Sequence, residues 1–383
     1  MSDRPPKMRW CARCCYPASS AVPLAFDAEG VCSGCRVAAQ RDIVDWDVRA
    51  LRFVELLEEY RKKKTGTYDL IVPVSGGKDS FWQVHTVKEL GYNPLLVTYH
   101  GNNYTEVGLR NLRRMREAFD CDHVFFTPSI RVLKVLNRLG MQVMGDPNWH
   151  AHAGIFTYPI REAVLRNIPL MLWGEMGYAD LGGMHSLSDY VEFTARFRHE
   201  HALRGYEWHD MVRLAPQYGE TLLADDMDPW KYPCDDAIDA VGVRGVYLSN
   251  YIKWEANEHG PLMEKLYGFE SAPPGFFERT YRRMSNLDDQ HENGIHDYMK
   301  WVKFGYGRCT DHVCKDIRAG LMTREQGIEE VRKRDHIKSR DLWRWLSYVG
   351  WTEAKFDECA DKFRDKRVWW KDESGNWCKD NIV

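Results

Sequence analysis

The sequence predicts an α/β protein built around a parallel β-sheet with helices on both faces. Short apolar runs alternate with segments of helical periodicity through the first half of the chain. These runs are apolar throughout, which is typical of strands that are buried on both sides of a sheet. A cysteine-rich N-terminal segment and a mostly helical last third complete the predicted architecture.

Composition excludes several classes of protein. The chain has 383 residues, 44% hydrophobic and 28% charged, with a formal net charge of -3. Such a chain is globular, with two or three domains, and its charge argues against binding nucleic acid. The 11 cysteines are an odd number and cannot all pair with one another, so we expect a reducing compartment. With no apolar signal segment and no membrane span in the sequence, we expect a cytoplasmic protein.

The N-terminal segment carries two pairs of cysteines, Cys11 with Cys14 and Cys32 with Cys35, each pair separated by two residues. This spacing is typical of zinc ribbons, in which each pair gives two thiolates to a tetrahedral Zn²⁺ site. Cys15 could replace Cys14 as a ligand. A site closed by four sulfurs leaves no position for water, so we expect a structural zinc in a module over residues 1–40.

The next segments follow in order along the chain. Residues 41–66 are predicted to form a linking helix, and residues 67–255 a domain built on the sheet. Strands are predicted at 68–74, 94–99, 123–127, 169–173 and 246–252, and helices at 80–90, 105–119, 130–139 and 155–166. Residues 256–383 are predicted to be mostly helical, with a capping box formed by Thr323 and Gln326. Because parallel sheets bind ligands beyond the carboxyl ends of their strands, we expect the site in the loops there.

A glycine-rich loop connects the first strand to its helix. Two glycines let backbone N–H groups converge on an anion, the helix N-terminus adds its positive dipole, and a lysine can neutralise phosphate charge. The loop is not a Walker A motif, because Asp79 follows the lysine where that motif requires serine or threonine. Its residues are Ser75, Gly76, Gly77, Lys78, Asp79 and Ser80.

The S-G-G-K-D-S sequence after a first strand resembles the signature of PP-loop ATP pyrophosphatases. The resemblance implies a Rossmann-like (HUP-type) PP-loop ATP-binding domain over residues 67–255. It also implies that the loop holds the β- and γ-phosphates of ATP while the α-phosphorus is attacked, so that AMP and pyrophosphate are released.

Further motifs narrow the resemblance. They are W-G-E ending at Glu175, Y-I-K-W containing Lys253, and the long stretch from Gly294 to His312. With the cysteine pairs and the Trp-rich C-terminal region, they resemble the N-acetyl sugar amidotransferase family of bacterial surface-polysaccharide and nonulosonic acid pathways, over nearly the whole chain. The family resemblance places the protein in glycan synthesis of the lipopolysaccharide O-antigen type.

The resemblance implies a reaction, cofactors and partners. The acetamido carbonyl of an N-acetylated, nucleotide-linked sugar is adenylated, and ammonia-derived nitrogen replaces its oxygen to give an acetamidino group. ATP and Mg²⁺ are the implied cofactors beside zinc. No glutaminase domain is evident, and the resemblance implies that ammonia comes from a separate glutaminase and synthase pair similar to that of histidine biosynthesis.

Residue roles follow from the resemblance and from side-chain chemistry. The loop would hold pyrophosphate, with Asp79 helping to bind Mg²⁺ through water. The end of the second strand would line the adenosine pocket with Thr98, Tyr99 and His100. The residues expected to act in catalysis are Lys78, Asp79, Glu175, Asp311 and His312. Those expected to bind the sugar nucleotide are Lys253, Lys303 and Arg308.

Several alternatives stay open on the sequence. Glu175 could position a metal, ammonia or the substrate, or it could cap a helix. Asp311 could also cap a helix instead of acting in catalysis. His312 could transfer protons, or it could only pack against its neighbours. Cys309, His312 and Cys314 could be three ligands of a second metal, or this cluster could provide a thiol nucleophile.

The main rival function is that of a PP-loop tRNA sulfurtransferase, which needs a persulfide cysteine and a basic RNA-binding surface. The net charge speaks against this rival. An ATP-gated scaffold and ligation of the asparagine- or argininosuccinate-synthetase type are compatible with the loop alone.

Overall fold

The fold is centred on a five-stranded parallel sheet with the strand order β3-β2-β1-β4-β5. The computed structural model describes residues 4–381. The strands are β1 (Leu70–Pro73), β2 (Pro94–Tyr99), β3 (His123–Phe126), β4 (Leu170–Trp173) and β5 (Arg244–Tyr247). This confirms the predicted α/β class. The fifth strand is shorter than predicted because the chain turns into a 3-10 helix, η4 (Leu248–Asn250).

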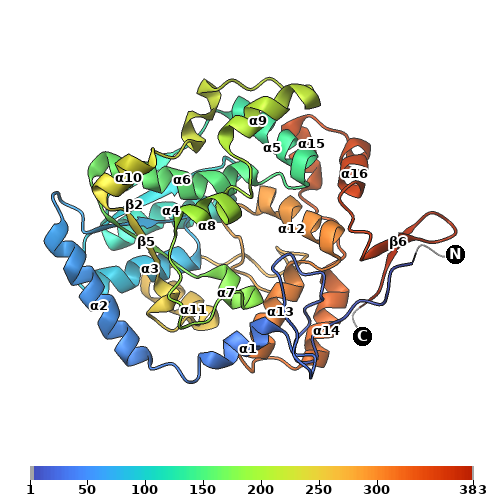
Figure 1. The fold of residues 1–383 in the computed structure, drawn as a ribbon, viewed down its shortest axis with the longest axis horizontal. Helices are drawn as coiled ribbons and strands as arrows, with labels where there is room; N and C mark the ends of the chain where they lie inside the picture. Colours follow the sequence, from blue (N-terminus) through green and yellow to red (C-terminus); the bar gives the residue numbers. More distant parts are fainter. Residues whose placement is uncertain (1–3, 382–383) are drawn as a thin grey trace.

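The sheet is covered on both faces, as its apolar strands require. Leu70 and Val72 of β1 pack in one core with Phe81, whereas Ile71 points into another core with Ile160. Side chains of a strand alternate between faces, so one strand supplies both cores. Figure 1 shows α3 and α11 on one side of the sheet and α6 on the other. The helices there are α3 (Lys78–Glu89), α4 (Glu106–Phe119), α5 (Ile130–Met144), α6 (Trp149–Arg166) and α11 (Ala256–Tyr267).

The order of the sheet reverses between β1 and β4. β1 pairs with β2 on one side and with β4 on the other, so the connections that leave these strands run to opposite faces. A crevice opens at the carboxyl edge of a parallel sheet at such a point. The loops that follow β1, β2 and β4 meet there, which positions the glycine-rich loop at the centre of the molecule.

Shorter elements connect β4 to β5. They are α7 (Gly177–Gly182), α8 (Ala195–Phe197), the π-helix η1 (Arg198–Ala202), α9 (Trp208–Leu214), the 3-10 helices η2 (Ala215–Tyr218) and η3 (Asp225–Trp230), and α10 (Asp235–Val241). Of these, α7 matters most to the site, because it follows Glu175 directly.

The C-terminal part is mostly helical, as predicted. It contains α12 (Gln290–Phe304), α13 (Arg308–Arg318), α14 (Arg324–Arg334), α15 (Leu342–Val349) and α16 (Glu353–Asp361). The predicted capping box is confirmed: Thr323 and Gln326 bond reciprocally at the start of α14. An antiparallel hairpin of β6 (Trp369–Lys371) and β7 (Trp377–Lys379) follows and extends from the body of the molecule (Figure 1).

The N-terminal cysteine segment packs against this helical part. It runs into α1 (Ser33–Gln40), which contains Cys35, and α2 (Trp46–Lys63) follows. Its cysteines share one core with Tyr306, Val313 and Ile328. Figure 1 shows the segment beside α13 and α14. The segment is thus in direct contact with the helices that follow residue 305, and the domain boundaries at 40, 66 and 255 stay a prediction.

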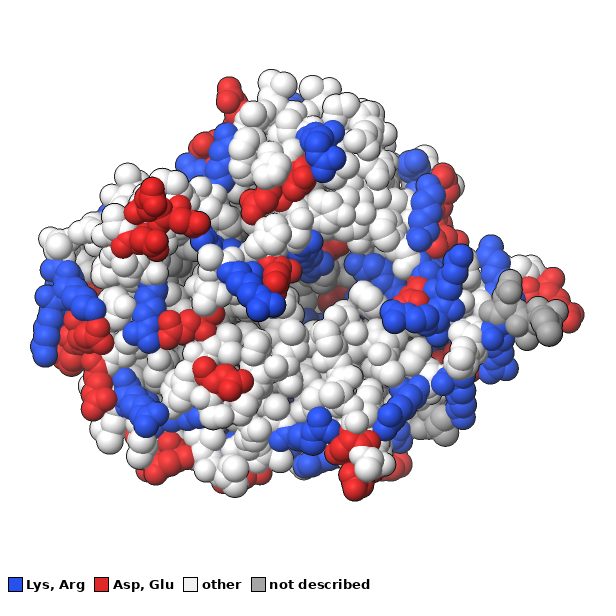
Figure 2. Space-filling model, in the orientation of Figure 1, with Lys and Arg blue, Asp and Glu red and all other residues white. Residues whose placement is uncertain are grey.

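The surface carries charges of both signs. Figure 2 shows lysine and arginine interspersed with aspartate and glutamate over the visible face, which is hollowed near its centre. None of the helices between residues 4 and 381 is both long and apolar enough to span a membrane.

Candidate active site

The glycine-rich loop runs from the end of β1 to the start of α3. Gly76 has φ +86°, and a Cβ there would lie 3.0 Å from Leu112, so both conformation and space require glycine. The Ser75 N–H donates to Ser80 Oγ at 3.0 Å, and the Gly77 N–H donates to Ser75 Oγ at 3.3 Å. These bonds fix the loop at the positive end of α3, which is a suitable place for a phosphate group.

Lys78 and Asp79 open α3 and form an ion pair, with 2.6 Å between Lys78 Nζ and Asp79 Oδ1. Desolvation raises the pKa of Asp79, but Lys78, Lys315 and His259 together hold that pKa below its ordinary value. Asp79 is therefore ionised at neutral pH. An anionic carboxylate beside a lysine at a phosphate-type loop suits binding of a magnesium–phosphate group.

A first cavity of about 320 Å³ lies next to the loop, at the carboxyl ends of β1, β2 and β4. Val97, Tyr99, Ile155 and Trp173 supply its apolar wall. An apolar cavity with a few polar groups at the reversal point of a parallel sheet is typical of a nucleotide site. We refer to it as the first cavity.

Only one of the three residues expected at the end of β2 lines this cavity. Tyr99 does. Thr98 instead donates from its Oγ1 to the Val74 carbonyl at 2.6 Å, and the ring of His100 packs on Tyr104 and Phe125. Because side chains alternate along a strand, Thr98 and His100 point away from the cavity that Tyr99 lines. Thr98 and His100 therefore do not line the first cavity.

A buried polar network that sequence reasoning missed also lines the first cavity. Tyr99 Oη and His150 Nδ1 lie 3.1 Å apart, and His150 Nε2 is hydrogen-bonded to Glu292, which accepts a further bond from Asn103. Residues from β2, α6 and α12 meet here, and no local sequence pattern links them. The nearest local signal is His291-Glu292 followed by His296, which does not fit the zinc-protease pattern H-E-x-x-H because the two histidines are five residues apart.

Two adjacent carboxyl groups, Asp288 and Asp289, complete the wall near the loop. Burial and, to a smaller extent, nearby Asp79 raise the pKa of Asp288 to about 6, although Ser75 and Arg308 act to lower it. Burial and Asp288 also raise the pKa of Asp289. Carboxylates crowded in this way would be stabilised by a divalent cation.

A second cavity of about 450 Å³ adjoins the first and shares Lys78, Asp79, Met284 and Asn286 with it. The structure brings six of the expected residues to this cavity. They are Lys78, Asp79, Glu175, Arg308, Asp311 and His312. Arg282, Arg283 and Lys315, which the sequence did not single out, add positive charge. The surplus of cationic side chains suits an anionic substrate.

Glu175 follows β4 and is held by Lys315, whose Nζ donates to both carboxylate oxygens at 3.1 and 2.9 Å. Lys315 also pairs with Asp180 at 2.5 Å. Burial and the neighbouring Asp180 raise the pKa of Glu175 to about 7, although Lys315 acts to lower it. The pKa of Asp180 lies below its ordinary value, because the positive charges of Lys315 and Arg41 outweigh the effect of burial, which would raise it. Glu175 is thus the proton-accepting member of the pair near neutral pH.

Asp311 lies inside α13 and does not cap it. The Tyr16 hydroxyl donates to Asp311 Oδ1 at 2.7 Å, and Lys300 bonds the other oxygen. Despite burial, Lys300 and Arg308 hold the pKa of Asp311 below its ordinary value. The capping role belongs to Asp335, which accepts bonds from the N–H groups at the start of the helix.

His312 is buried and bonded on both ring nitrogens. Nδ1 lies 2.5 Å from Thr280 Oγ1 and Nε2 lies 3.2 Å from Ser285 Oγ. Burial lowers the pKa of His312 well below its ordinary value, and Arg308, Arg282, Lys315 and Lys78 lower it further. The ring is therefore neutral at pH 7 and can accept a proton but has none to spare as an acid.

The three expected substrate-binding residues lie apart. Arg308 lines the second cavity and bonds Asn286 at 2.7 Å. Lys253 is paired with Glu255 at 2.7 Å and lines a different cavity, which adjoins the second. Lys303 is largely enclosed and donates to the Met144 carbonyl at 3.3 Å, away from both cavities. Lys253 and Lys303 therefore do not line the second cavity beside Arg308.

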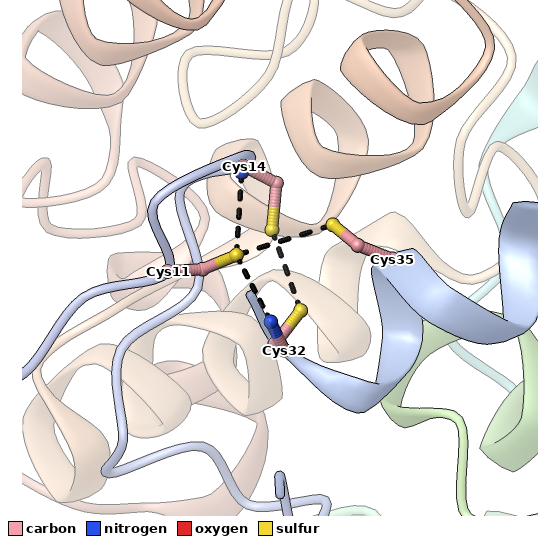
Figure 3. A group of neighbouring side chains, drawn as sticks. All are labelled: Cys11, Cys14, Cys32 and Cys35. Atoms are coloured by element: carbon pink, nitrogen blue, oxygen red, sulfur yellow. Dashed lines mark hydrogen bonds between the residues drawn. The ribbon is translucent and has the colours of Figure 1, made fainter. Parts of the chain in front are cut away.

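The four N-terminal cysteines converge on one point, as Figure 3 shows. Cys11 and Cys35 sulfurs are 4.0 Å apart, those of Cys14 and Cys32 are 3.7 Å apart, and all four lie within 4.8 Å of one another. A tetrahedral Zn²⁺ with Zn–S bonds of about 2.3 Å separates its sulfurs by about 3.8 Å. The cluster is compatible with structural zinc.

Cys15 is not part of this cluster. Its N–H donates to Cys314 Sγ at 3.3 Å, and its own sulfur faces the Arg324 carbonyl at 3.9 Å. Over residues 4–381, neither Cys309 nor Cys314 belongs to a group of side chains that could hold a metal. The second metal site considered for them and His312 therefore has no support in the structure.

Arg318 joins the cysteine cluster to the second cavity. Its guanidinium lies 3.6 Å from Cys32 Sγ and donates at 2.7 Å to the carbonyl of Asp180, the partner of Lys315. The positive charge offsets that of thiolates around a metal. Because Arg318 and Lys315 both belong to α13, the cysteine cluster and the cavity residues are held by the same helix.

Comparison with known families gives one match. Residues 277–380 match a model described as LPS biosynthesis protein WbpG-like, C-terminal domain. This range contains Asp288, Glu292, Arg308, Asp311 and His312. The comparison with curated proteins found no match.

Solved structures with partial similarity include two synthetases. One is an NH3-dependent NAD synthetase from Campylobacter jejuni subsp. jejuni NCTC 11168, at 13% identity and TM-score 0.29, covering 52% of this chain and 92% of that chain. Another is an NMN synthetase from Francisella tularensis, at 10% identity and TM-score 0.37, covering 78% of this chain and 95% of that chain. We draw no functional conclusion from similarities this weak. The match to the WbpG-like C-terminal domain of lipopolysaccharide biosynthesis proteins, over residues 277–380, supports the family that the sequence motifs indicated.

Proposed function

We propose that the protein is an ATP-dependent amidotransferase that converts the acetamido group of an N-acetylated sugar into an acetamidino group, in the synthesis of a bacterial surface glycan. The observation that carries the proposal is the junction of two cavities at Lys78 and Asp79. A phosphate-type loop and an apolar pocket lie on one side, and a cationic pocket with proton-accepting groups lies on the other. The match to a lipopolysaccharide biosynthesis domain supports this class of substrate.

ATP occupies the first cavity in this proposal. Its pyrophosphate lies on the loop at residues 75–80, and its adenosine lies against Tyr99 and Trp173, so the α-phosphorus comes to the junction with the second cavity. Asp79 and Asp288 are the carboxylates suited to hold Mg²⁺, because both line the first cavity beside the loop. The cation would neutralise phosphate charge as pyrophosphate departs.

The sugar occupies the second cavity. Arg308 binds the diphosphate of its nucleotide, an arrangement that guanidinium groups favour. The acetamido oxygen attacks the α-phosphorus, pyrophosphate leaves, and the carbonyl carbon becomes electrophilic because its oxygen now belongs to a good leaving group. Lys78 at the junction stabilises the charge that develops on the phosphate oxygens.

Ammonia then adds to the activated carbon. Its lone pair forms the new C–N bond, and the C–O bond breaks with its electrons leaving on AMP, which carries away the former amide oxygen. Two protons leave ammonium during the exchange, and the amidine departs as its cation. Glu175 and neutral His312 are the bases available in the second cavity.

Zinc and partners complete the proposal. The four-cysteine cluster holds Zn²⁺ as a structural ion, which stabilises the N-terminal segment against α13 and α14. Ammonia comes from a separate glutaminase and synthase pair, because the chain contains no evident glutaminase motif. Eleven unpaired cysteines fit a reducing cytoplasm.

The rival sulfurtransferase needs a nucleophilic cysteine next to the activated carbon. Among the described residues, no cysteine lines either cavity. The mixed charges of the face in Figure 2 also contrast with the basic surface that RNA binding needs.

The test is a direct comparison of substrates. The protein is incubated with ATP, Mg²⁺ and ammonium, and with either an N-acetylated UDP- or CMP-linked sugar or bulk tRNA. We expect pyrophosphate release that depends on the sugar and on ammonium, and a product in which NH replaces oxygen by mass. Turnover stimulated by tRNA alone, with sulfur gained by the tRNA, would show that the proposal is wrong.

A further inference from the structure

A third cavity of about 620 Å³ adjoins the second. The two share four polar side chains, which are Glu175, Asn257, Arg282 and Lys315. The third cavity shares no lining residue with the first. The three cavities therefore follow one another in series, with the second in the middle.

The outer part of the third cavity is formed by elements that take no part in the nucleotide pocket. Ala38 comes from α1, Glu258 from α11, and Gly320 and Leu321 from the turn after α13. Leu321 is 62% exposed, so this end of the cavity reaches the surface. A small molecule that enters here reaches Glu175 without passing the glycine-rich loop.

Ion pairs define the junction between the second and third cavities. Lys315 bridges Glu175 and Asp180, while Arg282 pairs with Asp316 at 2.5 Å and Asn257 donates to the same carboxylate at 2.9 Å. Each cation at the junction already has a carboxylate partner. The junction between the second and third cavities is thus polar and nearly balanced in charge. Unlike the second cavity, it has no surplus of cations that could bind a sugar diphosphate.

We propose that the third cavity is the ammonia entrance and that Glu175, at its junction with the second cavity, takes a proton from arriving ammonium. This inference rests on the proposed function. With ATP in the first cavity and the sugar in the second, the third cavity is the remaining approach to the activated carbon along this series. A polar, balanced passage suits a small molecule that interconverts between NH4⁺ and NH3.

The chemistry at Glu175 is a single proton transfer. The carboxylate accepts a proton from NH4⁺, which leaves NH3 with a free lone pair, and the protonated carboxyl later returns its proton to solvent through the third cavity. The groups that face Glu175 are Asp79 of α3, Asp180 of α7, Lys315 of α13 and Arg41 after α1. Burial and Asp180 raise the pKa of Glu175 towards neutrality, which suits a group that exchanges protons in both directions.

The test separates activation of the sugar from delivery of nitrogen. Exchange of labelled pyrophosphate into ATP requires the sugar but not ammonium, whereas amidine formation requires both. Glu175→Gln should retain sugar-dependent exchange and lose amidine formation by about 10²- to 10⁴-fold, the usual contribution of a general base. Retained amidine formation would overturn the assignment of Glu175.

A second variant tests the route rather than the base. Glu258→Trp places a large ring in the third cavity, which Glu258 lines without reaching the second, and we expect a lower kcat/KM for ammonium with unchanged KM for ATP and for the sugar. Leu266→Trp, a half-exposed position on the same helix that lines none of the three cavities, is the matched control. A raised KM for the sugar alone would mean that the sugar enters here and would overturn the route.

Failure of the proposed function would look different. If the wild-type protein shows no sugar-dependent pyrophosphate exchange, then the sugar is not the activated substrate, and the inference falls with the function. If exchange is normal but neither Glu175→Gln nor Glu258→Trp affects the use of ammonium, only the ammonia entrance is wrong.

Discussion

Tyr16 connects the cysteine cluster to the second cavity through one hydrogen bond, and its removal is a sharp test of that connection. The Tyr16 hydroxyl donates at 2.7 Å to Asp311 Oδ1, and Asp311 is 2% exposed. A hydrogen bond to a charged group contributes about 1.5–3 kcal/mol, and a buried carboxylate that loses a donor bears that full cost. We expect Tyr16→Phe to lower the free energy of unfolding by this amount at pH 7.

The sign of the pH dependence follows from Asp311. Its pKa lies below the ordinary value in the folded protein, so its contribution is present in full above about pH 3.9, the unfolded value, and is lost as the pH falls through the folded pKa. The difference between wild type and Tyr16→Phe should therefore be constant between pH 6 and 8, over a range where Asp311 stays ionised.

Urea unfolding is the assay, with zinc content measured on the same samples. Tyr218→Phe is the matched control, because Tyr218 is 39% exposed and should be neutral. Zinc content should be unchanged in both variants. A Tyr16→Phe protein as stable as wild type would refute the idea that this hydroxyl stabilises the Asp311 carboxylate.

Three further predictions concern the loop, the cysteines and the buried histidine. Gly76→Ala should lower the free energy of unfolding by about 1–2 kcal/mol, because its backbone is left-handed, and should also weaken ATP binding. Gly91→Ala, at φ +76° with open space around it, should lower stability alone. Urea unfolding and ATP titration measure the two effects. Cys14→Ser should lose zinc by metal analysis, and Cys15→Ser should keep it. By NMR, His312 should not titrate between pH 5.5 and 8, because its pKa is lowered in the folded protein. Below about pH 6.5 the unfolded chain binds a proton at this histidine and the folded protein does not, so the histidine lowers the stability of the fold as the pH drops. An imidazolium signal at pH 6 would contradict this.

The sheet and the loop could be predicted because their signals are local. A continuous apolar run identifies a buried strand, and the residues of the loop are contiguous, so β1, α3 and the positions of Lys78 and Asp79 followed directly. The cysteine pairs are also local. Cys14 could not be separated from Cys15 by spacing, because the choice depends on Cys314, which lies 299 residues away and contacts Cys15.

The other site residues could not be predicted, because their roles depend on side-chain direction and on contacts between distant parts of the chain. The end of β2 was placed correctly, but the alternation that sends Tyr99 into the cavity and Thr98 and His100 away from it depends on which face of the sheet meets α6. The bonds of His150 and Lys315 come from residues far along the chain, Glu292 and Glu175, and only the folded protein brings them together. Lys303 illustrates the converse: its charge suggested a phosphate partner, but packing turns it to a backbone carbonyl.

The central claim is that the acetamido carbonyl is adenylated, and transfer of its oxygen tests this most directly. The protein is given an N-acetylated nucleotide sugar labelled with ¹⁸O in the acetamido group, together with ATP, Mg²⁺ and ammonium, and the AMP is analysed by mass spectrometry. The account predicts that AMP carries the ¹⁸O and that Lys78→Ala, with normal zinc content, forms neither AMP nor pyrophosphate. AMP without the label, or a Lys78→Ala protein with wild-type turnover, would contradict it.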